Sequence, residues 1–308
     1  MIGVGYLGRF HAQKYAQLAD CELVAVVDGR EEVHKAVAAE TSSRGIADYR
    51  ELLGKVDAVS VVTPTPAHFE IADAFLAAGA HVLVEKPITE TPEQARALIA
   101  RAASANRVLQ VGHLERFNAA VLAAEPHLHA PRFMECVRLA PYKERGTDVN
   151  VVLDLMIHDI DLVQSLAGSD IVSIDAIGTP VFSGEIDIAN ARLRFANGCV
   201  ANVTASRVSM KTERKLRIFE DAAYMSLDLQ QKILTLIRKR TGAPQAGQLP
   251  VSIEESNLEQ GDALKSEIAS FLDCIRNNQR PVVSGEDGLR ALETAIRITE
   301  QVHANLAR

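Results

Sequence analysis

Residues 1–28 read MIGVGYLGRFHAQKYAQLADCELVAVVD, and this stretch decides the fold class. Gly3, Gly5 and Gly8 form a Gly-x-Gly-x-x-Gly turn. The first glycine allows a tight bend, the second lets the backbone approach a pyrophosphate, and the third lets the next helix pack close to a sheet. Asp28 follows Gly8 by 20 residues, where a carboxylate accepts hydrogen bonds from the adenosine ribose hydroxyls. The spacing predicts a strand–turn–helix unit that binds a dinucleotide.

The first third of the chain alternates short apolar runs with helix-like stretches. Unbroken β-branched runs are typical of strands that are buried on both faces of a parallel sheet. We expect such strands at residues 23–27, 58–62, 82–84 and 108–111. We expect helices at residues 9–18, 30–40, 68–78 and 92–104, with Gly79 ending the third. The alternation predicts an α/β class of fold, with a Rossmann domain over residues 1–112.

The pattern changes after residue 112. A helix is expected at 152–166, and two more close the chain at 261–277 and 287–306, the last one capped by Ser284. Strand-like runs lie near residues 132–139, 171–181, 187–195, 199–208, 213–219 and 223–229. Asn197-Gly198 is typical of a hairpin turn, and residues 241–250 (TGAPQAGQLP) indicate a loop. Consecutive strands without helices between them predict an α+β domain over residues 113–308 with a large, mostly antiparallel sheet.

The first strand is unusually short. Only Met1 and Ile2 precede the glycine turn, whereas a strand normally has about 5–6 residues. A truncated central strand would leave the backbone of its neighbours unpaired. We therefore expect the natural reading frame to begin upstream of Met1, with a shortened strand as the alternative.

Composition excludes several classes of protein. The 308 residues are 47% hydrophobic and 24% charged, which excludes disorder as the main state. A net charge of −7 disfavours nucleic-acid binding through bulk charge. We see no apolar run near the roughly 20 residues that span a bilayer, and no secretory leader. Four cysteines without a metal-binding or disulfide pattern favour a reduced, cytoplasmic protein.

Further candidate cofactor residues follow the expected strands. The carboxyl ends of parallel strands form the ligand crevice of a doubly wound sheet. The candidates are Tyr6, Leu7, Arg30, Thr63, Pro64, His68, Glu85 and Lys86. Thr65-Pro66 could simply start a helix, and His68 could be a structural histidine. Asp28 would repel a 2′-phosphate, which favours NAD over NADP, although Arg30 could pair with that phosphate.

A polar stripe interrupts the apolar helix at 152–166. Asp154, His158 and Asp161 are spaced i, i+4, i+7, whereas Asp159 points away from them. A histidine beside carboxylates is held in orientation and can act as a base near neutral pH. A solvated face, a structural hydrogen-bond network and a divalent-metal site are the alternatives. We expect no metal cofactor.

Together these motifs resemble the Gfo/Idh/MocA oxidoreductases over nearly the whole chain. The marks are GVGYLGRFH with His11, TPTPAH at 63–68, EKP at 85–87, the D-x-x-x-H-x-x-D of 154–161, and PVVSGEDGLRALETA at 281–295. The resemblance implies an NAD-dependent dehydrogenase that oxidises a sugar hydroxyl. It implies His158 as the base, Asp154 as its orienting partner and Lys86 on the reacting oxygen, or Lys86 as the proton acceptor. It also implies a cis Lys86–Pro87 peptide bond.

Within that family, GHLERFN at 112–118 and LDLMIHDIDL at 153–162 look most like a bacterial group that oxidises nucleotide sugars. That likeness implies oxidation of UDP-N-acetylglucosamine to its 3-keto form for amino-sugar lipid A. Basic residues that could face a diphosphate are Arg116, Lys143, Arg145, Arg207, Lys211 and Arg214. An inositol or simple sugar dehydrogenase and a non-catalytic dinucleotide sensor are the alternatives, and Lys86, Asp154 and His158 argue against the sensor.

The resemblance also implies a homodimer or homotetramer built on residues 113–308, the part that would bind the substrate. Strand 199–205 carries Ala201, Val203 and Ala205 on one face and Val200, Asn202 and Thr204 on the other. Neither face is strongly polar, so a sheet covered by helices on one side would offer its other side to a second copy. We expect no nucleic-acid or membrane partner.

Overall fold

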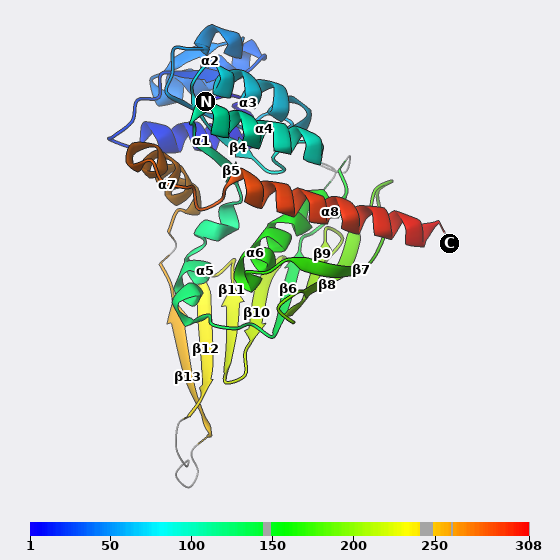
Figure 1. Cartoon of the computed structure of the whole chain (residues 1–308). Coiled ribbons are helices and arrows are strands. Elements are labelled where there is room, and N and C mark those ends of the chain that lie inside the picture. The colour runs from blue at the N-terminus through cyan, green and yellow to red at the C-terminus, as the bar shows by residue number, and fades with distance from the viewer. Residues whose placement is uncertain (144–148, 241–248, 260, 308) are drawn as a thin grey trace. The chain divides into compact units, whose positions relative to one another are not determined.

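The computed structural model describes residues 1–143, 149–240, 249–259 and 261–307 (Figure 1). The chain forms two compact units. The first consists of Met1–Leu114 and Asp262–Leu292, and the second of Glu115–Gly261 and Glu293–Arg308. The first unit thus includes a segment from the C-terminal third, which differs from the division at residue 112 expected from the sequence.

A parallel sheet forms the centre of the first unit. Its strands are β1 (Ala25–Val27), β2 (Arg44–Ile46), β3 (Ala58–Val61), β4 (His81–Glu85) and β5 (Leu109–Gly112). β1 pairs with β2, and β3, β4 and β5 pair in that order, all in parallel. Strand β2 was not expected, because this three-residue strand has two exposed residues and no apolar run. The expected Rossmann fold is confirmed.

Residues 1 and 2 connect the two halves of this sheet. Ile2 forms parallel bridges with Val27 of β1 and with Val61 of β3. The N–H of Ile2 donates to the Ser60 carbonyl at 2.8 Å, and the N–H of Val62 donates to the Ile2 carbonyl at 2.8 Å. These two residues therefore occupy the place of a central strand, directly before the glycine turn.

Helices surround this sheet. They are α1 (Tyr6–Ala16), α2 (Glu31–Thr41), α3 (His68–Ala77), α4 (Pro92–Ala105), α7 (Ala263–Asn277) and the first turns of α8 (Gly285–Leu306). Gly79 follows α3 with φ 87°, as expected for a helix end. The N–H of Ser284 donates to the Asp287 carboxylate, and the N–H of Asp287 donates to the Ser284 hydroxyl oxygen. The expected cap before α8 is therefore confirmed.

Helix α7 belongs to the first unit because of its apolar stripe. Leu264, Ile268, Phe271 and Leu272 recur at helical spacing and are buried together with core residues of α1 and the parallel sheet. The sequence predicts the helix but not the surface that it covers. That surface lies in a part of the chain about 250 residues earlier.

One eight-stranded sheet dominates the second unit. Its strands are β6 (Phe133–Leu139), β7 (Ile171–Thr179), β8 (Ile188–Phe195), β9 (Val200–Ser206), β10 (Glu213–Phe219), β11 (Ala223–Asp228), β12 (Ile233–Lys239) and β13 (Val251–Asn257). Their order is β13-β12-β11-β10-β6-β9-β8-β7. Among the described pairings of this sheet, only β6–β9 is parallel. The expected mostly antiparallel sheet is confirmed.

The two faces of this sheet differ. In β9, Ala201, Val203 and Ala205 are buried, whereas Val200, Asn202 and Thr204 are partly exposed. Helices α5 (Ala119–Ala124) and α6 (Ile157–Ala167) lie on one face of the sheet (Figure 1). The outward-facing residues of neighbouring strands are also only partly buried, so the residues that the structure describes leave the second face open.

Other local expectations have mixed outcomes. Gly198 has φ 88° in the β8–β9 hairpin, as expected for Asn-Gly. Strands β12 and β13 were missed; β13 is an edge strand with exposed, largely polar residues, so it carries no core pattern. The loop expected at 241–250 falls mostly on residues 241–248, outside the described residues. Among those that are described, no helix combines the length and the apolar character needed to cross a bilayer.

Candidate active site

The glycine turn has the geometry of a cradle for an anion. Gly3 has φ 79°, and a Cβ added at Gly8 would lie 1.9 Å from the Gly3 carbonyl oxygen. A Cβ at Gly5 would meet only Arg30, at 3.6 Å, so the Gly5 backbone can be approached from outside. Gly5 caps α1 without a side chain, and the first turn of α1 has no acidic residue. Its backbone N–H groups are therefore directed toward a site for negative charge.

Asp28 directly follows β1, beside this turn. Its carboxylate accepts the N–H of Val4 at 3.3 Å and the Nε and Nη2 groups of Arg30 at 3.0 and 3.1 Å. Burial alone would raise the pKa of Asp28, but the hydrogen bonds and charge of Arg30 outweigh burial and hold that pKa below its usual value. Asp28 is therefore an anion oriented toward the turn, as a ribose-binding carboxylate must be.

Two loops at the carboxyl ends of β3 and β4 are joined by His68. This buried side chain contacts the carbonyl oxygens of Thr63 and Pro87, both at 2.9 Å. Burial lowers its pKa, against the opposing effect of these carbonyls. His68 thus holds the Thr63 loop against the Lys86–Pro87 turn and has no ring nitrogen left for a ligand. The Thr63 hydroxyl is buried and has no hydrogen-bond partner among the described residues, while Pro64 is exposed.

Glu85 and Lys86 follow directly from β4. The Lys86–Pro87 peptide is cis, which confirms that expectation. The carboxylate of Glu85 accepts the N–H of Lys86 at 3.1 Å and contacts Nε2 of His11 at 3.1 Å. A Cβ at Gly112 on β5 would lie 2.8 Å from this carboxylate, so the glycine leaves room for it. The Lys86 side chain is half-buried at the end of β4.

The second unit positions Asp154 and His158. The expected helix at 152–166 is present, but it begins with a π-helix, Val152–Met156, before α6. Asp154 lies in the π-helix, and His158 lies in the first turn of α6. Both side chains are half-buried, whereas most of their neighbours are fully buried. π-helical segments within helices are frequent at functional sites.

The remaining acids of this helix serve the fold. Asp161 accepts two hydrogen bonds from Arg116, at 2.7 and 3.2 Å, and both residues are buried. Asp159 accepts two from Arg138, at 2.9 and 2.7 Å, and Arg138 also bonds Glu115. The stripe of three polar residues expected from the sequence thus reduces to Asp154 and His158, because Asp161 is neutralised by a buried arginine.

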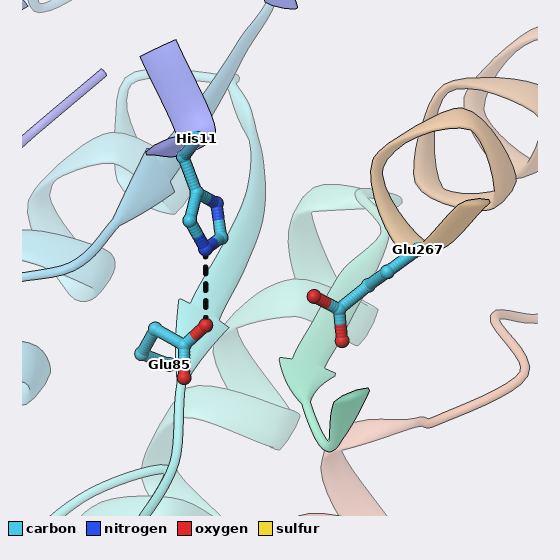
Figure 2. A group of neighbouring side chains, drawn as sticks. All are labelled: His11, Glu85 and Glu267. Carbon is cyan, nitrogen blue, oxygen red and sulfur yellow. Dashed lines mark hydrogen bonds and ion pairs between the residues drawn. The ribbon is translucent and has the colours of Figure 1, made fainter. Parts of the chain in front are cut away.

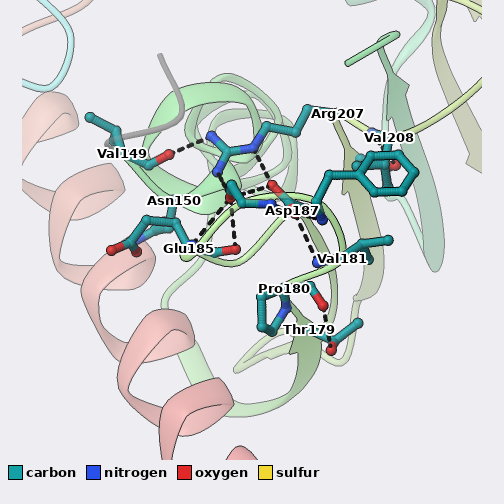
Figure 3. A network of polar contacts seen from close by, with 12 residues as sticks. Val149, Asn150, Thr179, Pro180, Val181, Glu185, Asp187, Arg207 and Val208 are labelled. Carbon is teal, nitrogen blue, oxygen red and sulfur yellow. Dashed lines mark hydrogen bonds and ion pairs between the residues drawn. The ribbon is translucent and has the colours of Figure 1, made fainter. Parts of the chain in front are cut away.

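A second buried network supports the start of the π-helix (Figure 3). Asp187 accepts Nε of Arg207 at 2.7 Å and the N–H groups of Val181, Phe182 and Ser183. Arg207 in turn donates to the Val149 carbonyl at 2.5 Å. Next to it, Oδ1 of Asn150 caps the N–H groups of Val152 and Leu153. The segment that leads into the π-helix of Asp154 is therefore fixed by Arg207 at Val149 and by the Asn150 cap.

The basic residues expected to face a diphosphate have different environments. Arg116 and Arg207 are buried in the ion pairs just described, so that expectation is wrong for them. Lys211 pairs with Glu213. Arg214 is half exposed and Lys143 is exposed, and both stay candidates. Arg145 lies outside the described residues.

Sequence reasoning missed several residues that shape these sites. Glu267 on α7 lies beside Glu85 and His11, and Gly112, Asn150 and Asp187 support functional turns. Only Glu267 had a visible sign, since it is a charged residue on the apolar stripe of α7. The others depend on contacts between distant segments.

Comparison with known proteins identifies the family. Residues 1–113 match the model described as "Oxidoreductase family, NAD-binding Rossmann fold", and residues 121–225 match the GFO/IDH/MocA C-terminal domain. UDP-N-acetylglucosamine 3-dehydrogenase of Acidithiobacillus ferrooxidans is 40% identical over 309 residues, covering 100% of this chain and 98% of that enzyme. Its solved structure matches with a TM-score of 0.94, covering 100% of this chain and 97% of that one.

More distant relatives share the same layout. Inositol 2-dehydrogenase of Rhizobium meliloti is 25% identical and covers 96% of this chain and 93% of that enzyme. Scyllo-inositol dehydrogenase of Lactobacillus casei, solved with NAD(H) and scyllo-inositol, is 22% identical with a TM-score of 0.81, which shows the fold alone; the match covers 99% of this chain and 96% of that one. The open Gly5 backbone, the Asp28 carboxylate and the Thr63 hydroxyl, which bonds to none of the described residues, fit NAD. The chain belongs to the Gfo/Idh/MocA family of NAD-dependent oxidoreductases.

Proposed function

We propose that this oxidoreductase oxidises the 3-hydroxyl of UDP-N-acetylglucosamine. The observation that carries the proposal is the 40% identity, over the full length of both chains, to an enzyme named for that reaction. The inositol dehydrogenases are less similar, at 25% identity for the Rhizobium meliloti enzyme. A nucleotide sugar therefore ranks above inositol as the substrate.

The first unit holds the cofactor in this proposal. Gly3, Gly5 and Gly8 with the N–H groups of Tyr6 and Leu7 receive the pyrophosphate. Asp28, flanked by Arg30, receives the adenosine ribose, while Thr63, Pro64, Glu85 and Lys86 form the crevice toward the nicotinamide. His68 contributes by holding two of these loops together. NAD, when bound, accepts the hydride.

The chain's own catalytic work is the transfer of one proton. As the ring carbon loses hydride, its hydroxyl must lose a proton to a base within hydrogen-bond reach. We assign that role to His158, with Asp154 orienting the imidazole. The ammonium of Lys86 binds the same oxygen and stabilises its growing negative charge. Lys86 as the acceptor, with His158 completing a relay, is the variant of this mechanism.

A substrate panel tests the function. Purified protein is mixed with NAD or NADP and with UDP-N-acetylglucosamine, UDP-glucose, free N-acetylglucosamine or myo-inositol, and the absorbance of reduced nicotinamide is followed. Turnover highest with NAD and UDP-N-acetylglucosamine, with a ketone at C3 by NMR, supports the proposal. Faster turnover of inositol identifies the rival dehydrogenase. Tight NAD binding without turnover of any panel member favours the dinucleotide sensor.

We infer a cytoplasmic enzyme whose 3-keto product serves the synthesis of amino-sugar lipid A. We also infer a homodimer or homotetramer that assembles through the open face of the eight-stranded sheet. Three aromatic rings from β6, β10 and β11 stack on one another there, Phe133, Phe219 and Tyr224.

A further inference from the structure

Three buried side chains meet below the Lys86 turn. His11 comes from α1, Glu85 from the end of β4 and Glu267 from α7 (Figure 2). One nitrogen or oxygen atom from each lies within 4.8 Å of the others. All three elements belong to the first unit, yet their sequence positions span most of the chain.

The two carboxyl groups have unequal surroundings. Glu85 accepts hydrogen bonds from the Lys86 N–H and from His11, both at 3.1 Å. Glu267 is completely buried, and neither of its oxygens has a hydrogen-bond partner among the described residues. Figure 2 shows its carboxyl group directed toward the His11–Glu85 pair.

Electrostatics permits only one of these groups to be a carboxylate. Two buried negative charges at such a distance repel strongly, and an ionised carboxylate without hydrogen bonds has lost its hydration without compensation. Burial and the charge of Glu85 both raise the pKa of Glu267 well above its usual value. Burial alone would also raise the pKa of Glu85, but His11 and the N–H and charge of Lys86 outweigh it and lower that pKa.

We propose that Glu267 is a neutral carboxylic acid in the folded protein, and that its proton keeps the one negative charge of this cluster on Glu85, where it positions Lys86. The titratable groups that face Glu267 are His11 and Tyr15 from α1 and Glu85 from β4. Burial raises the pKa of Tyr15. The part that concerns Lys86 rests on the proposed function; the proton on Glu267 does not.

The link to Lys86 is direct. The Glu85 carboxylate accepts the backbone N–H of Lys86, and its negative charge attracts the ammonium of the same lysine. Ionisation of Glu267 would push Glu85 to take a proton, which would remove that charge and weaken the hydrogen bond. Glu85 and Glu267 are thus positioning residues, because they act on the substrate through Lys86.

Infrared difference spectroscopy tests the proton. The spectrum of wild type minus Glu267→Gln, at neutral pH, should contain the carbonyl stretch of one protonated carboxyl group, shifted in D₂O. The variant should keep the wild-type melting temperature to within a few degrees, because the amide replaces a neutral group of the same shape, whereas Glu267→Ala should melt well below it. Glu93→Gln, at an exposed carboxylate on α4, is the control. The spectrum of wild type minus Glu93→Gln should contain no such band.

Two outcomes would overturn the proposal. One is the absence of the protonated carboxyl band. The other is a stoichiometric divalent metal, measured by elemental analysis of wild type and lost in Glu267→Gln, because the cluster would then balance its charge with a cation. Neither measurement needs a substrate, so both remain informative if the proposed reaction is wrong.

The effect on Lys86 is read from the two kinetic constants. The Glu85 carboxylate accepts the N–H of Lys86, so Glu85→Gln should lower kcat by about tenfold or more with KM nearly unchanged, because the ammonium is displaced from the reacting oxygen. Glu93→Gln should match wild type in both constants. An unchanged kcat in Glu85→Gln would show that Glu85 serves structure alone.

Discussion

At the scale of single residues, Gly5 carries the clearest test of the cofactor site. An added Cβ meets nothing closer than Arg30 at 3.6 Å, so we expect Gly5→Val to fold, while its side chain fills the space that a pyrophosphate needs. We expect NAD affinity to fall by at least about 100-fold, roughly 2.7 kcal/mol, with an unchanged melting temperature. Isothermal titration with NAD measures it, and wild-type affinity would refute the placement.

Asp28 and Arg30 make a second prediction. In Asp28→Ala the ribose loses its acceptor and Arg30 loses its partner, which frees the guanidinium for a 2′-phosphate. The ratio of kcat/KM for NAD over NADP should fall by about tenfold or more, equal to at least about 1.4 kcal/mol. The double variant Asp28→Ala/Arg30→Ala is the control, in which NADP should gain less. An unchanged ratio in the single variant would remove Asp28 from the ribose site.

His158 carries the proton-transfer prediction. His158→Ala should reduce turnover by about 10²–10⁴-fold, and higher pH should restore part of it because hydroxide replaces the base. NAD affinity should stay close to wild type, since the residues that we propose for the cofactor belong to the first unit. Stopped-flow turnover and NAD titration on the same sample separate these effects. A less stable protein with normal turnover per folded molecule would instead mean a structural role.

At the scale of elements, the Asp187–Arg207 network fixes the entrance to the Asp154 turn. Burial alone would raise the pKa of Asp187, but hydrogen bonds from Ser183, Arg207 and Phe182 outweigh it and depress that pKa. A depressed pKa contributes stability that is fully present above the unfolded pKa of about 3.9 and is lost as the pH falls from there through the folded pKa. Acid should therefore weaken the network from about pH 4 downward.

Asp187→Asn tests that network. It leaves Arg207 buried without its anion, which should reduce the free energy of unfolding at pH 7 by about 3–5 kcal/mol. Urea unfolding measures the loss, and the difference from wild type should shrink below about pH 4. Asp221→Asn, at an exposed pair with Arg132, should change little. Equal losses in both variants would contradict a special role for Asp187.

The elements also show what sequence patterns can predict. The helices with a polar and an apolar side were placed to within a few residues, because burial of one side imposes a period on their side chains. Strands such as β3 and β4 were placed equally well, because burial of both faces requires an unbroken apolar run. Strands β2 and β13 lie at sheet edges, where no such period is imposed. Gly3, Gly5, Gly8 and Asp28 were visible because their spacing is local. The pairing of Asp161 with Arg116 could not be predicted, because the two residues come from separate segments of the chain.

At the scale of the whole molecule, the open face of the eight-stranded sheet predicts self-association. Light scattering at micromolar concentration should give a dimer or tetramer. Phe219→Lys puts a charge into the aromatic patch of this face, and burying that charge in the interface should weaken association at least about tenfold. Phe182→Lys, at an exposed ring away from the sheet strands, is the control. A monomeric wild-type protein would contradict the prediction.

The route of the chain has a consequence for protein engineering. The first unit is completed by α7 and the beginning of α8, and the helix α8 continues into the second unit after Leu292. A chimaera that exchanges substrate preference between relatives therefore needs three junctions, near residues 114, 261 and 292. A single crossover after residue 114 would graft a foreign α7 onto the apolar surface of the host. Directed recombination between family members should accordingly yield active enzymes mainly when α7 and the parallel sheet come from the same parent.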